Sequence, residues 1–276
     1  ITDMQFKTIQ GVEVPEIGLG TYTLIGKTGE QTIKAALNMG YRHIDTAQDY
    51  KNEREVGNAI RQSHVKREEL FITTKVDWKN LEPDKVLKST ERSLQELDIP
   101  YVDLLLIHWP NPDVPVEKTM EAMLSLRDQG KVLNIGVSNF PMKLLKEVNE
   151  DLAAPIFCNQ VEYHPLLGQF DLLDYAADQD ILVTAYSPLG QGSILQEPLL
   201  IELGEKYGKT PAQIALRWLV EQEQVVVIPK ASSKEHLEAN IDIYDFVLED
   251  DDFYAIDDLD KDKRVVNPDF APEWDN

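Results

Sequence analysis

The 276-residue sequence has a single cysteine, Cys158, and no long hydrophobic run. One cysteine excludes an intramolecular disulfide, and the first five residues show neither the basic nor the apolar region of a signal peptide. No apolar segment approaches the roughly 20 residues that a membrane-spanning helix needs. These absences predict a reducing, cytoplasmic setting and no membrane partner.

Basic residues are scarce relative to acidic ones. The chain has 27 Lys and Arg against 49 Asp and Glu, a formal net charge of −22. Such a surface repels nucleic acid, so we expect none as a partner. Because salt screens the self-repulsion, a halophilic cell with an acidic proteome is one hypothesis for the habitat. An ordinary acidic enzyme is the alternative, and the excess of lysine over arginine does not favour the salt hypothesis.

Two kinds of site find little support among the motifs. The five histidines show neither His-x-His nor His-Glu-x-x-His spacing, so we expect no metal site. Taken singly, His43 and His164 are more typical of structural residues. The run from Gly18 to Thr23 lacks the third glycine of a dinucleotide fingerprint. Any nucleotide must therefore bind in another way.

Short β-branched runs alternate with amphipathic stretches, and no linker divides them. Eight alternating βα units predict parallel strands closed into a single-domain (β/α)8 TIM barrel over residues 1–276. Residues 4–14 predict a β-hairpin across the barrel bottom, an acidic helix begins at 249, and 265–276 predict a short C-terminal tail lying on the barrel. The expected strands are 16–21, 42–45, 71–76, 102–108, 135–138, 156–161, 181–186 and 225–228, and the expected helices are 31–39, 53–63, 83–97, 116–129, 144–149, 172–179, 211–221 and 234–241.

Polar side chains stand where the expected strands end, which is where barrel enzymes place their active sites. Asp45 ends the second strand with Tyr50 five residues on, Lys75 ends the third, and His108 ends the fourth. Each alone has a structural explanation, as a cap, a packing aromatic, a surface amine or a core imidazole. Together, an acid, a phenol, an amine and an imidazole at one rim predict a proton-relay site.

Several ordered motifs carry a resemblance to a known family. They are Gly18–Thr21, Tyr41–Ala47, Tyr50–Glu53, Leu106–Pro110, Ile135–Phe140, Asn159–Pro165, Tyr186–Gly190 and Ile228–Lys230. From about Phe6 to Asp269 the chain resembles the aldo-keto reductases, and among them the 2,5-diketo-gluconate reductase-like branch. The resemblance implies NAD(P)H-dependent reduction of aldehydes or ketones to alcohols.

The resemblance also implies roles for the residues at the strand ends. Tyr50 would be the general acid, and Lys75 beside it would lower the pKa of the phenol. Asp45 would hold the Lys75 ammonium, and His108 would orient the substrate carbonyl. The implied NADPH contacts are Gly20, Thr21, Tyr22, Asp45, Ser138, Asn139, Gln160, Tyr186, Ser187, Pro188, Leu189, Gly190, Gln191, Lys230, Ser232, Ser233, His236 and Asn240.

One segment departs from the family pattern. Lys230, Ser232 and Ser233 could still hold a 2′-phosphate, but His236 stands where such enzymes usually carry an arginine, and Ala239 where they carry a glutamate. An arginine offers a permanent forked charge, which a neutral imidazole does not. We therefore expect the NADPH preference to be weakened, with NADH as a second coenzyme.

Aromatic residues after the strand ends predict a substrate pocket rather than core. Tyr22 and Trp109 match positions that form the pocket wall in the family. Trp78 is predicted to be a third wall residue, although Asp77 shifts it by one residue from the usual Lys-x-Trp spacing. Tyr50 and His108 complete the predicted substrate contacts. The flanking loops and the tail are short, which favours an open site for small polar aldehydes or keto-sugars. We expect a monomer.

Two other functions remain open at this point. A non-catalytic nicotinamide-sensing module could use the same barrel, but it would tolerate loss of the four catalytic groups, which are all present. A barrel glycosidase could use Asp45 and Glu162 as its carboxylate pair, although that leaves Tyr50 and Lys75 without roles.

Overall fold

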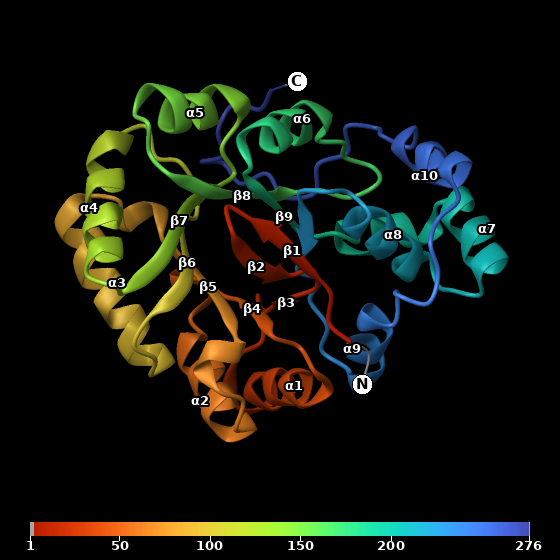
Figure 1. Cartoon of the computed structure of the whole chain (residues 1–276), viewed down its shortest axis with the longest axis horizontal. Helices are drawn as coiled ribbons and strands as arrows, with labels where there is room; N and C mark the ends of the chain where they lie inside the picture. The colour runs from red at the N-terminus through yellow and green to blue at the C-terminus, as the bar shows by residue number, and fades with distance from the viewer. Residues whose placement is uncertain (1–2, 276) are drawn as a thin grey trace.

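A computed structural model describes residues 3–275, and its centre is an eight-stranded parallel sheet (Figure 1). Each strand pairs with the next one along the chain. A parallel bridge between Ile17 and Val227 joins the two edges of the sheet and closes the barrel. The strands are β3 (Leu19–Gly20), β4 (His43–Asp45), β5 (Phe71–Val76), β6 (Val102–Ile107), β7 (Val132–Ser138), β8 (Ile156–Glu162), β9 (Leu182–Tyr186) and β10 (Val225–Val227).

The helices surround this barrel (Figure 1). Within residues 3–275, none of them is both long and apolar enough to cross a membrane. Short 3-10 turns lie between the longer elements, among them η1 (Gln48–Tyr50), η3 (Trp78–Asn80) and η5 (Gly190–Gln196). The α-helices are α1 (Gly26–Met39), α2 (Glu53–Ser63), α3 (Pro83–Leu97), α4 (Val116–Asp128), α5 (Met142–Lys146), α6 (Phe170–Gln179), α7 (Pro198–Tyr207), α8 (Pro211–Val220), α9 (Lys234–Ile241) and α10 (Asp250–Asp257).

The predicted TIM barrel is confirmed, with differences at some element ends. The expected bounds hold for β5, α2, α3 and α9. The first barrel strand is shorter than expected, since only Leu19–Gly20 form a regular strand. The helix expected at 144–149 begins at Met142 and continues as a π-helical turn over Glu147–Asp151. Helix α7 was not predicted.

The predicted N-terminal hairpin is confirmed as β1 (Phe6–Ile9) paired antiparallel with β2 (Val12–Pro15). Figure 1 shows it at the centre of the ring of strands. Ile9 and Val14 belong to the hydrophobic cluster inside the barrel, together with Phe71, Leu104 and Phe157. The hairpin therefore closes one end of the barrel and leaves the other end open for the site.

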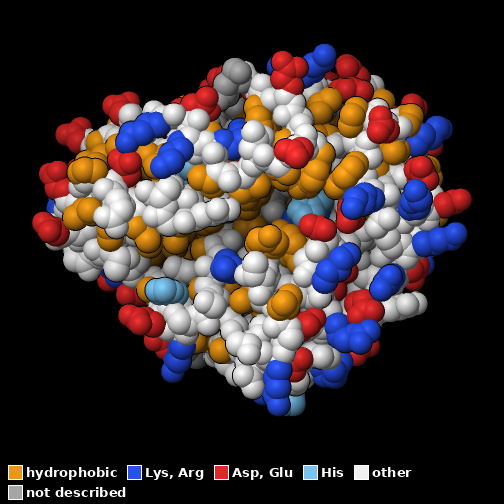
Figure 2. All heavy atoms as spheres, turned by 180° about the vertical axis from the view of Figure 1, so that it is seen from behind, with side chains coloured by type: hydrophobic (Ala, Val, Ile, Leu, Met, Phe, Trp, Pro, Cys, Tyr) orange, Lys and Arg blue, Asp and Glu red, His pale blue; other side chains and the backbone are white. Residues whose placement is uncertain are grey.

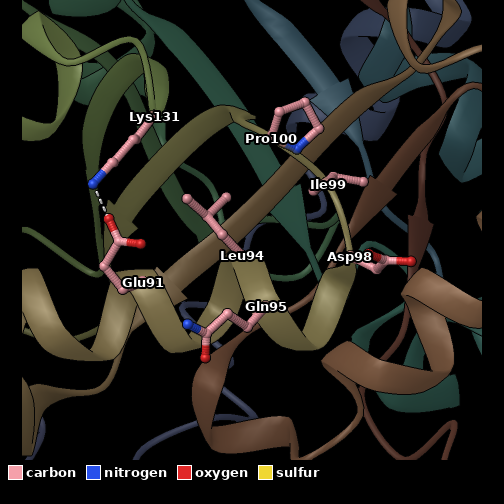
Figure 3. Close-up of a pocket in the computed structure, with 7 residues that line it drawn as sticks. All are labelled: Glu91, Leu94, Gln95, Asp98, Ile99, Pro100 and Lys131. Carbon is pink, nitrogen blue, oxygen red and sulfur yellow. Dashed lines mark hydrogen bonds and ion pairs between the residues drawn. The ribbon is translucent and has the colours of Figure 1, made fainter.

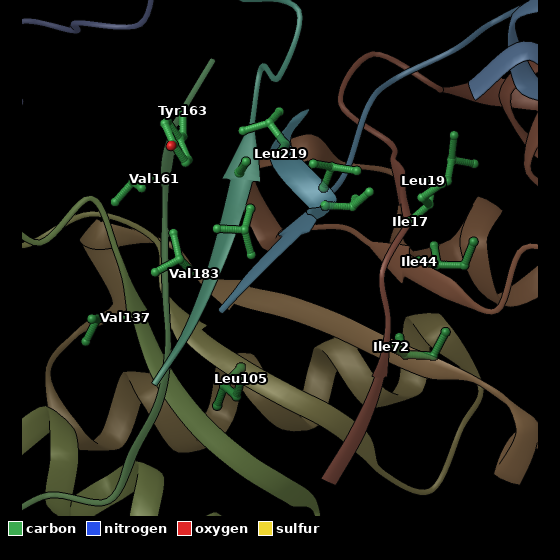
Figure 4. Packing of buried hydrophobic residues seen from close by; sticks show 14 of the residues in the cluster. Ile17, Leu19, Ile44, Ile72, Leu105, Val137, Val161, Tyr163, Val183 and Leu219 are labelled. Atoms are coloured by element: carbon green, nitrogen blue, oxygen red, sulfur yellow. The ribbon is translucent and has the colours of Figure 1, made fainter. Parts of the chain in front are cut away.

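Side chains along each strand point alternately into the barrel and toward the helices, and this divides the hydrophobic core into two layers. In β5, Phe71 joins the cluster inside the barrel, whereas Ile72 and Val76 join the larger cluster between strands and helices (Figure 4). The period of two places Lys75 on the same side as Phe71, hence in the interior. The same rule turns the polar residues at the strand ends inward, and this forms the site.

Candidate active site

The four predicted catalytic residues meet at the open end of the barrel. The Lys75 Nζ atom donates hydrogen bonds to Asp45 Oδ1 at 2.5 Å, to the Thr46 carbonyl oxygen at 3.0 Å and to the Tyr50 hydroxyl at 3.1 Å. Asp45 and Lys75 are fully buried. The rings of Tyr50 and His108 lie edge to face, with centroids 5.6 Å apart. The structure thus brings together an acid, an amine, a phenol and an imidazole from three adjacent strands and a turn.

A local network delivers Tyr50 to Lys75. Tyr50 ends the η1 turn, and Lys51 leaves it in the left-handed region at φ 57°. The next residue, Asn52, is buried, accepts from Thr46 Oγ1 at 2.6 Å and donates to the Thr21 carbonyl at 2.7 Å. Asn52 lies inside a predicted motif, but no role was predicted for it. Its amide ties the loop after β3 to the loop after β4, two residues beyond Tyr50.

Burial and the neighbouring charges shift the pKa of Lys75 in opposite directions, and the same is true for the pKa of Tyr50. Burial by itself lowers the pKa of Lys75, but the Asp45 carboxylate and the Tyr50 hydroxyl outweigh it and raise that pKa. Burial raises the pKa of Tyr50, and Lys75 offsets this only in part. Lys75 does lower the pKa of the phenol as predicted, but the net direction is upward. The site therefore holds a cationic lysine beside a protonated tyrosine.

His108 directly follows β6 on the same rim, and its imidazole is neutral. Burial, with a smaller contribution from the Lys75 charge, holds the pKa of the imidazole well below its ordinary value of 6.5. A neutral imidazole keeps one N–H that can donate a hydrogen bond. Seen from behind the view of Figure 1, the molecule has a hollow near its centre that is edged by hydrophobic side chains (Figure 2). This is the side of the barrel away from the hairpin.

Buried amides and hydroxyls on β7, β8 and β9 complete the rim. Gln160 donates to Asp45 Oδ2 at 2.7 Å, which links this part of the rim to the Asp45–Lys75–Tyr50 group. Ser138 donates to the Gln160 carbonyl at 2.9 Å, and Asn139 Nδ2 donates to the His108 carbonyl at 3.0 Å. Tyr186 donates its hydroxyl to Asn139 Oδ1 at 2.6 Å. These four predicted coenzyme contacts therefore lie together.

The remaining predicted coenzyme contacts lie farther round the rim. Gly20 packs so closely on the residue after β10 that an added Cβ would lie 2.6 Å from the Ile228 carbonyl oxygen. Thr21 Oγ1 donates to the Asp45 carbonyl, and the exposed Tyr22 packs against Tyr50 with centroids 5.3 Å apart. Lys230 donates to Thr23 Oγ1 at 3.1 Å, so the segment from 230 to 240 lies beside this turn.

Within that segment the polar side chains differ in exposure. Ser232, Ser233 and His236 are exposed at the start of α9, and the Ser233 hydroxyl accepts from the His236 backbone amide as the helix cap. Asn240 is buried, unlike the other three. The predicted contacts Ser187, Pro188, Leu189, Gly190 and Gln191 form the loop after β9, where Ser187, Gly190 and Gln191 all have positive φ. Such a loop can present several backbone N–H groups to one ligand.

Aromatic side chains from two loops and the tail form one cluster. Trp78 stacks on Phe270 with centroids 4.9 Å apart, and Trp109 contacts both Phe270 and Trp274. The tail lies on the barrel, as predicted, but sequence reasoning missed Phe270 and Trp274 as part of the site wall. The available signal was two aromatic residues in the tail, Phe270 between Pro268 and Pro272 and Trp274 two residues after Pro272. The expected open site is therefore more covered than the short loops suggested.

Glu162 and Asp275 hold the tail in place. The Glu162 carboxylate accepts from the backbone amides of Val265 and Val266, with shortest distances of 2.9 and 2.7 Å, and pairs with His164 at 2.7 Å. At the other end, both oxygens of Asp275 accept from the Met142 amide at 3.0 Å.

A surface cavity lies away from this site. It has a volume of about 410 Å³ and lies on the surface beside α3 (Figure 3). An ion pair between Glu91 and Lys131 lies at one side of it. None of the predicted site residues lines it. The lining residues are Glu91, Leu94, Gln95, Asp98, Ile99, Pro100 and Lys131.

Comparison with known proteins identifies the family. The model of the Aldo/keto reductase family matches residues 16–261, which is most of the chain. The chain belongs to the Aldo/keto reductase family. It is therefore an enzyme of an oxidoreductase family, as its resemblance to the aldo-keto reductases implied.

The relatives of this aldo/keto reductase include bacterial reductases of small dicarbonyls. It is 44% identical to the glyoxal reductase of Bacillus subtilis over 265 residues, covering 95% of each chain. It is 40% identical to the methylglyoxal reductase DkgB of Yersinia pestis over 268 residues, covering 96% of this chain and all of the relative.

Solved structures resemble this aldo/keto reductase over its whole length. A crystal structure assigned as a 2,5-diketo-D-gluconic acid reductase B matches with a TM-score of 0.96 at 41% identity, covering 100% of this chain and 99% of that one. This agrees with the predicted branch. An aldo-keto reductase crystallised as a complex with NADPH matches with a TM-score of 0.92 at 31% identity, covering 100% and 94%.

Proposed function

We propose that this aldo/keto reductase uses NADPH to reduce small aldehydes and ketones to alcohols, with Tyr50 as the general acid. The observation that carries the proposal is the hydrogen-bonded group of Asp45, Lys75 and Tyr50 beside His108. When bound, a reduced nicotinamide supplies the hydride. Tyr50 gives its proton to the carbonyl oxygen as negative charge develops there.

The surrounding side chains fit this proton transfer. Because burial raises the pKa of Tyr50, the phenol keeps its proton until a carbonyl oxygen becomes basic enough to take it. The phenolate that remains lies 3.1 Å from the Lys75 ammonium, which stabilises it, and Asp45 keeps that ammonium charged and in place. His108 donates a hydrogen bond to the same carbonyl oxygen and fixes its position.

The rim offers suitable groups for a nicotinamide coenzyme. Ser138, Asn139 and Gln160 are buried side chains that supply both donors and acceptors for a carboxamide, and Tyr186 beside them offers a ring face. The NADPH complex of a related structure supports this choice. We propose that exposed His236 weakens the preference for NADPH, so that NADH also serves.

The coenzyme preference is tested by the ratio of kcat/KM with NADPH to kcat/KM with NADH. His236→Arg should raise that ratio about tenfold, because a permanent guanidinium charge adds a stronger contact to a 2′-phosphate. A wild-type ratio that already strongly favours NADPH would contradict the weakened preference.

The substrate class follows from the wall of the site. The names of two relatives describe reduction of glyoxal and methylglyoxal, both small carbonyl compounds. Trp78, Trp109 and Phe270 would restrict the site to such small molecules or to slim keto-sugars. Preferential turnover of bulky steroids in a substrate panel would contradict this. We further propose that the enzyme is monomeric and cytoplasmic. Light scattering tests the assembly state.

The general-acid role is tested by Tyr50→Phe. The variant should lose about 10²- to 10⁴-fold in kcat, the usual contribution of a positioned general acid, while NADPH binding measured by fluorescence stays close to wild type. Tyr254→Phe is the matched control, since Tyr254 is 62% exposed on α10. A folded Tyr50→Phe variant with full carbonyl turnover would refute the proposal.

The two alternative functions make different predictions. In a glycosidase, Asp45 and Glu162 would need carboxylate oxygens free for substrate, but Lys75 and Gln160 hold those of Asp45, and tail amides and His164 hold those of Glu162. A nicotinamide-sensing module would bind NADPH without turnover, so the wild-type assay separates it from the proposed reductase.

A further inference from the structure

Gln48 begins the η1 turn that carries Tyr50, and its side-chain amide makes three hydrogen bonds outside that turn. The amide oxygen accepts from the Asp77 backbone N–H at 3.0 Å and from Asn80 Nδ2 at 3.1 Å. The amide nitrogen donates to the Ser93 hydroxyl on α3 at 3.3 Å. One side chain therefore joins the turn of the proposed general acid to η3 and to α3.

Two of these partners lie at the two ends of η3, the turn that carries Trp78. Asp77 is the N-cap residue of η3, and Asn80 is its last residue. Trp78 stacks on Phe270 in the wall of the proposed substrate site, with ring centroids 4.9 Å apart. Gln48 thus ties the turn that would donate the proton to the turn that shapes the substrate wall.

The backbone of η1 holds itself only weakly. The Tyr50 N–H donates to the Ala47 carbonyl at 3.2 Å, and the Lys51 N–H donates to the Gln48 carbonyl at 3.4 Å. Both distances are long for hydrogen bonds of this kind. At the C-terminal end of the turn, the buried Asn52 side chain fixes the chain through the bonds described above. The Gln48 amide supplies the corresponding anchor at the N-terminal end.

The third partner of Gln48 belongs to a buried polar network on the outer side of β5. Ser93 donates to Glu53 Oε1 at 3.1 Å, and Thr74 donates to Glu53 Oε2 at 2.7 Å. Thr74 and Ser93 are fully buried, and Glu53 is only 9% exposed. Because side chains alternate along a strand, Thr74 points to the helices and the next residue, Lys75, points into the barrel. The network therefore connects Gln48 to the strand that supplies the amine.

We propose that Gln48 is a positioning residue that couples the general acid to the substrate wall. Its amide holds η1 and η3 in one arrangement, so that the Tyr50 hydroxyl stays 3.1 Å from Lys75 while Trp78 keeps a bound carbonyl group within reach of that hydroxyl. The inference rests on the proposed function, since it concerns the same reaction. Gln48 acts only through these neighbours and transfers no proton itself.

The test removes the three hydrogen bonds and nearly keeps the length of the side chain. Gln48→Met should lower kcat with NADPH and methylglyoxal by about 10- to 100-fold, the order expected when a reacting group is displaced by up to about 1 Å. The KM of methylglyoxal should rise, whereas the Kd of NADPH measured by fluorescence should stay unchanged. Gln48→Glu keeps an oxygen that can accept from Asp77 and Asn80, so it should recover part of the lost kcat. Gln62→Met makes the same exchange at an exposed position on α2 and should change none of these values.

A double-mutant cycle separates positioning from a general loss of structure. If Gln48 acts through the phenol, Gln48→Met should cost much less in kcat when Tyr50 is already replaced by phenylalanine than it costs in the wild type. An equal factor in both backgrounds would show that the glutamine acts independently of Tyr50, which would overturn the inference.

Hydrogen exchange followed by mass spectrometry gives a second measurement that needs no turnover. Gln48→Met should speed exchange in both 47–52 and 77–81 and leave the barrel strands unchanged. Faster exchange in only one of the two turns, or in neither, would show that the amide does not couple them, and the inference would be wrong. If the wild type binds NADPH but reduces no carbonyl compound, the proposed function fails, whereas the exchange data still decide whether Gln48 links the turns.

Discussion

At Tyr50, two opposing effects act on one hydroxyl group. Burial stabilises the neutral phenol, while the Lys75 ammonium at 3.1 Å favours the phenolate, and burial dominates in the free enzyme. In the proposed reaction the tyrosine would therefore act as a general acid that does not lose its proton to solvent at ordinary pH. Lys75 acts when the proton leaves, because the nearby ammonium lowers the free energy of the phenolate relative to an isolated buried phenolate.

This balance predicts a flat pH profile for carbonyl reduction. The acid form of Tyr50 persists up to its pKa, which lies above the ordinary value of 10.0, and the neutral form of His108 persists down to its pKa, well below 6.5. Neither group changes charge between these limits, so kcat/KM should stay constant from about pH 6.5 to about pH 9. Steady-state rates with saturating NADPH measure it. A decline centred near pH 6.5 on acidification, absent in His108→Gln, would contradict the neutral imidazole.

Because Asp45 and Lys75 are a buried ion pair, removing one partner should destabilise the fold more than removing both. Lys75→Met should lower the free energy of unfolding by about 3 to 5 kcal/mol, because it leaves the Asp45 carboxylate buried without its cation. The double variant Asp45→Asn/Lys75→Met should recover much of that loss, since no charge then remains buried. Urea unfolding followed by far-UV circular dichroism gives both values. If the double variant is as unstable as the single one, the loss comes from packing and not from the unpaired charge.

At the scale of elements, strand alternation explains why much of the site could be predicted. The position where each apolar run ends fixes which residue lies at the barrel rim, and the period of two fixes that it points inward. Asp45, Lys75, His108 and Gln160 all followed from this rule. The hydrogen bonds of Asn52 and Glu162 could not be predicted, because they depend on which loops lie side by side.

Helix α7 shows where periodicity fails. Leu199, Leu200 and Ile201 are consecutive apolar residues, and Gly204 interrupts the pattern three residues later, so no clear 3.6-residue period appears. Gly204 is required by packing, because a Cβ there would lie 2.7 Å from the Lys209 carbonyl oxygen. The close contact with the start of α8 is a tertiary constraint that the local sequence does not reveal.

The tail is an element whose position depends on one carboxylate. In Glu162→Gln one carboxylate oxygen becomes an NH₂ group. Oε1 accepts from the amides of Val265 and Val266, and Oε2 accepts from the His164 ring and Val265, so in either orientation of the glutamine at least one of these donors faces the NH₂ group without an acceptor. An unpaired buried donor costs about 1 to 3 kcal/mol, which should loosen the tail and raise the substrate KM severalfold. Hydrogen exchange followed by mass spectrometry should show faster exchange in 260–275 and no change in the barrel strands.

A matched surface variant controls this experiment. Glu96→Gln makes the same chemical change in the exposed pair with Arg54 and should alter neither exchange in the tail nor KM. Unchanged protection at 265 and 266 in Glu162→Gln would show that contacts of Phe270 and Trp274 hold the tail without the carboxylate.

For the whole molecule, the excess of acidic residues predicts stabilisation by salt. With 49 acidic and 27 basic residues, most carboxylates lack a cationic partner and repel one another, and the Debye length falls from about 10 Å at 0.1 M salt to about 3 Å at 1 M. Salt also weakens surface pairs such as Lys206–Glu249, but exposed pairs contribute little. Raising NaCl from 0.05 to 1 M should therefore raise Tm by roughly 3 to 6 °C, equivalent to about 1 to 2 kcal/mol.

A variant with less net charge separates screening from other effects of salt. Glu13→Lys, Glu202→Lys and Glu205→Lys replace exposed carboxylates and together change the formal charge from −22 to −16, because each exchange adds two positive charges. This triple variant should have the higher Tm at low salt and a smaller rise with NaCl, and KCl should act like NaCl because screening depends on ionic strength. A Tm that falls with salt, or a rise that is as large in the triple variant, would mean that self-repulsion does not limit the stability of this fold.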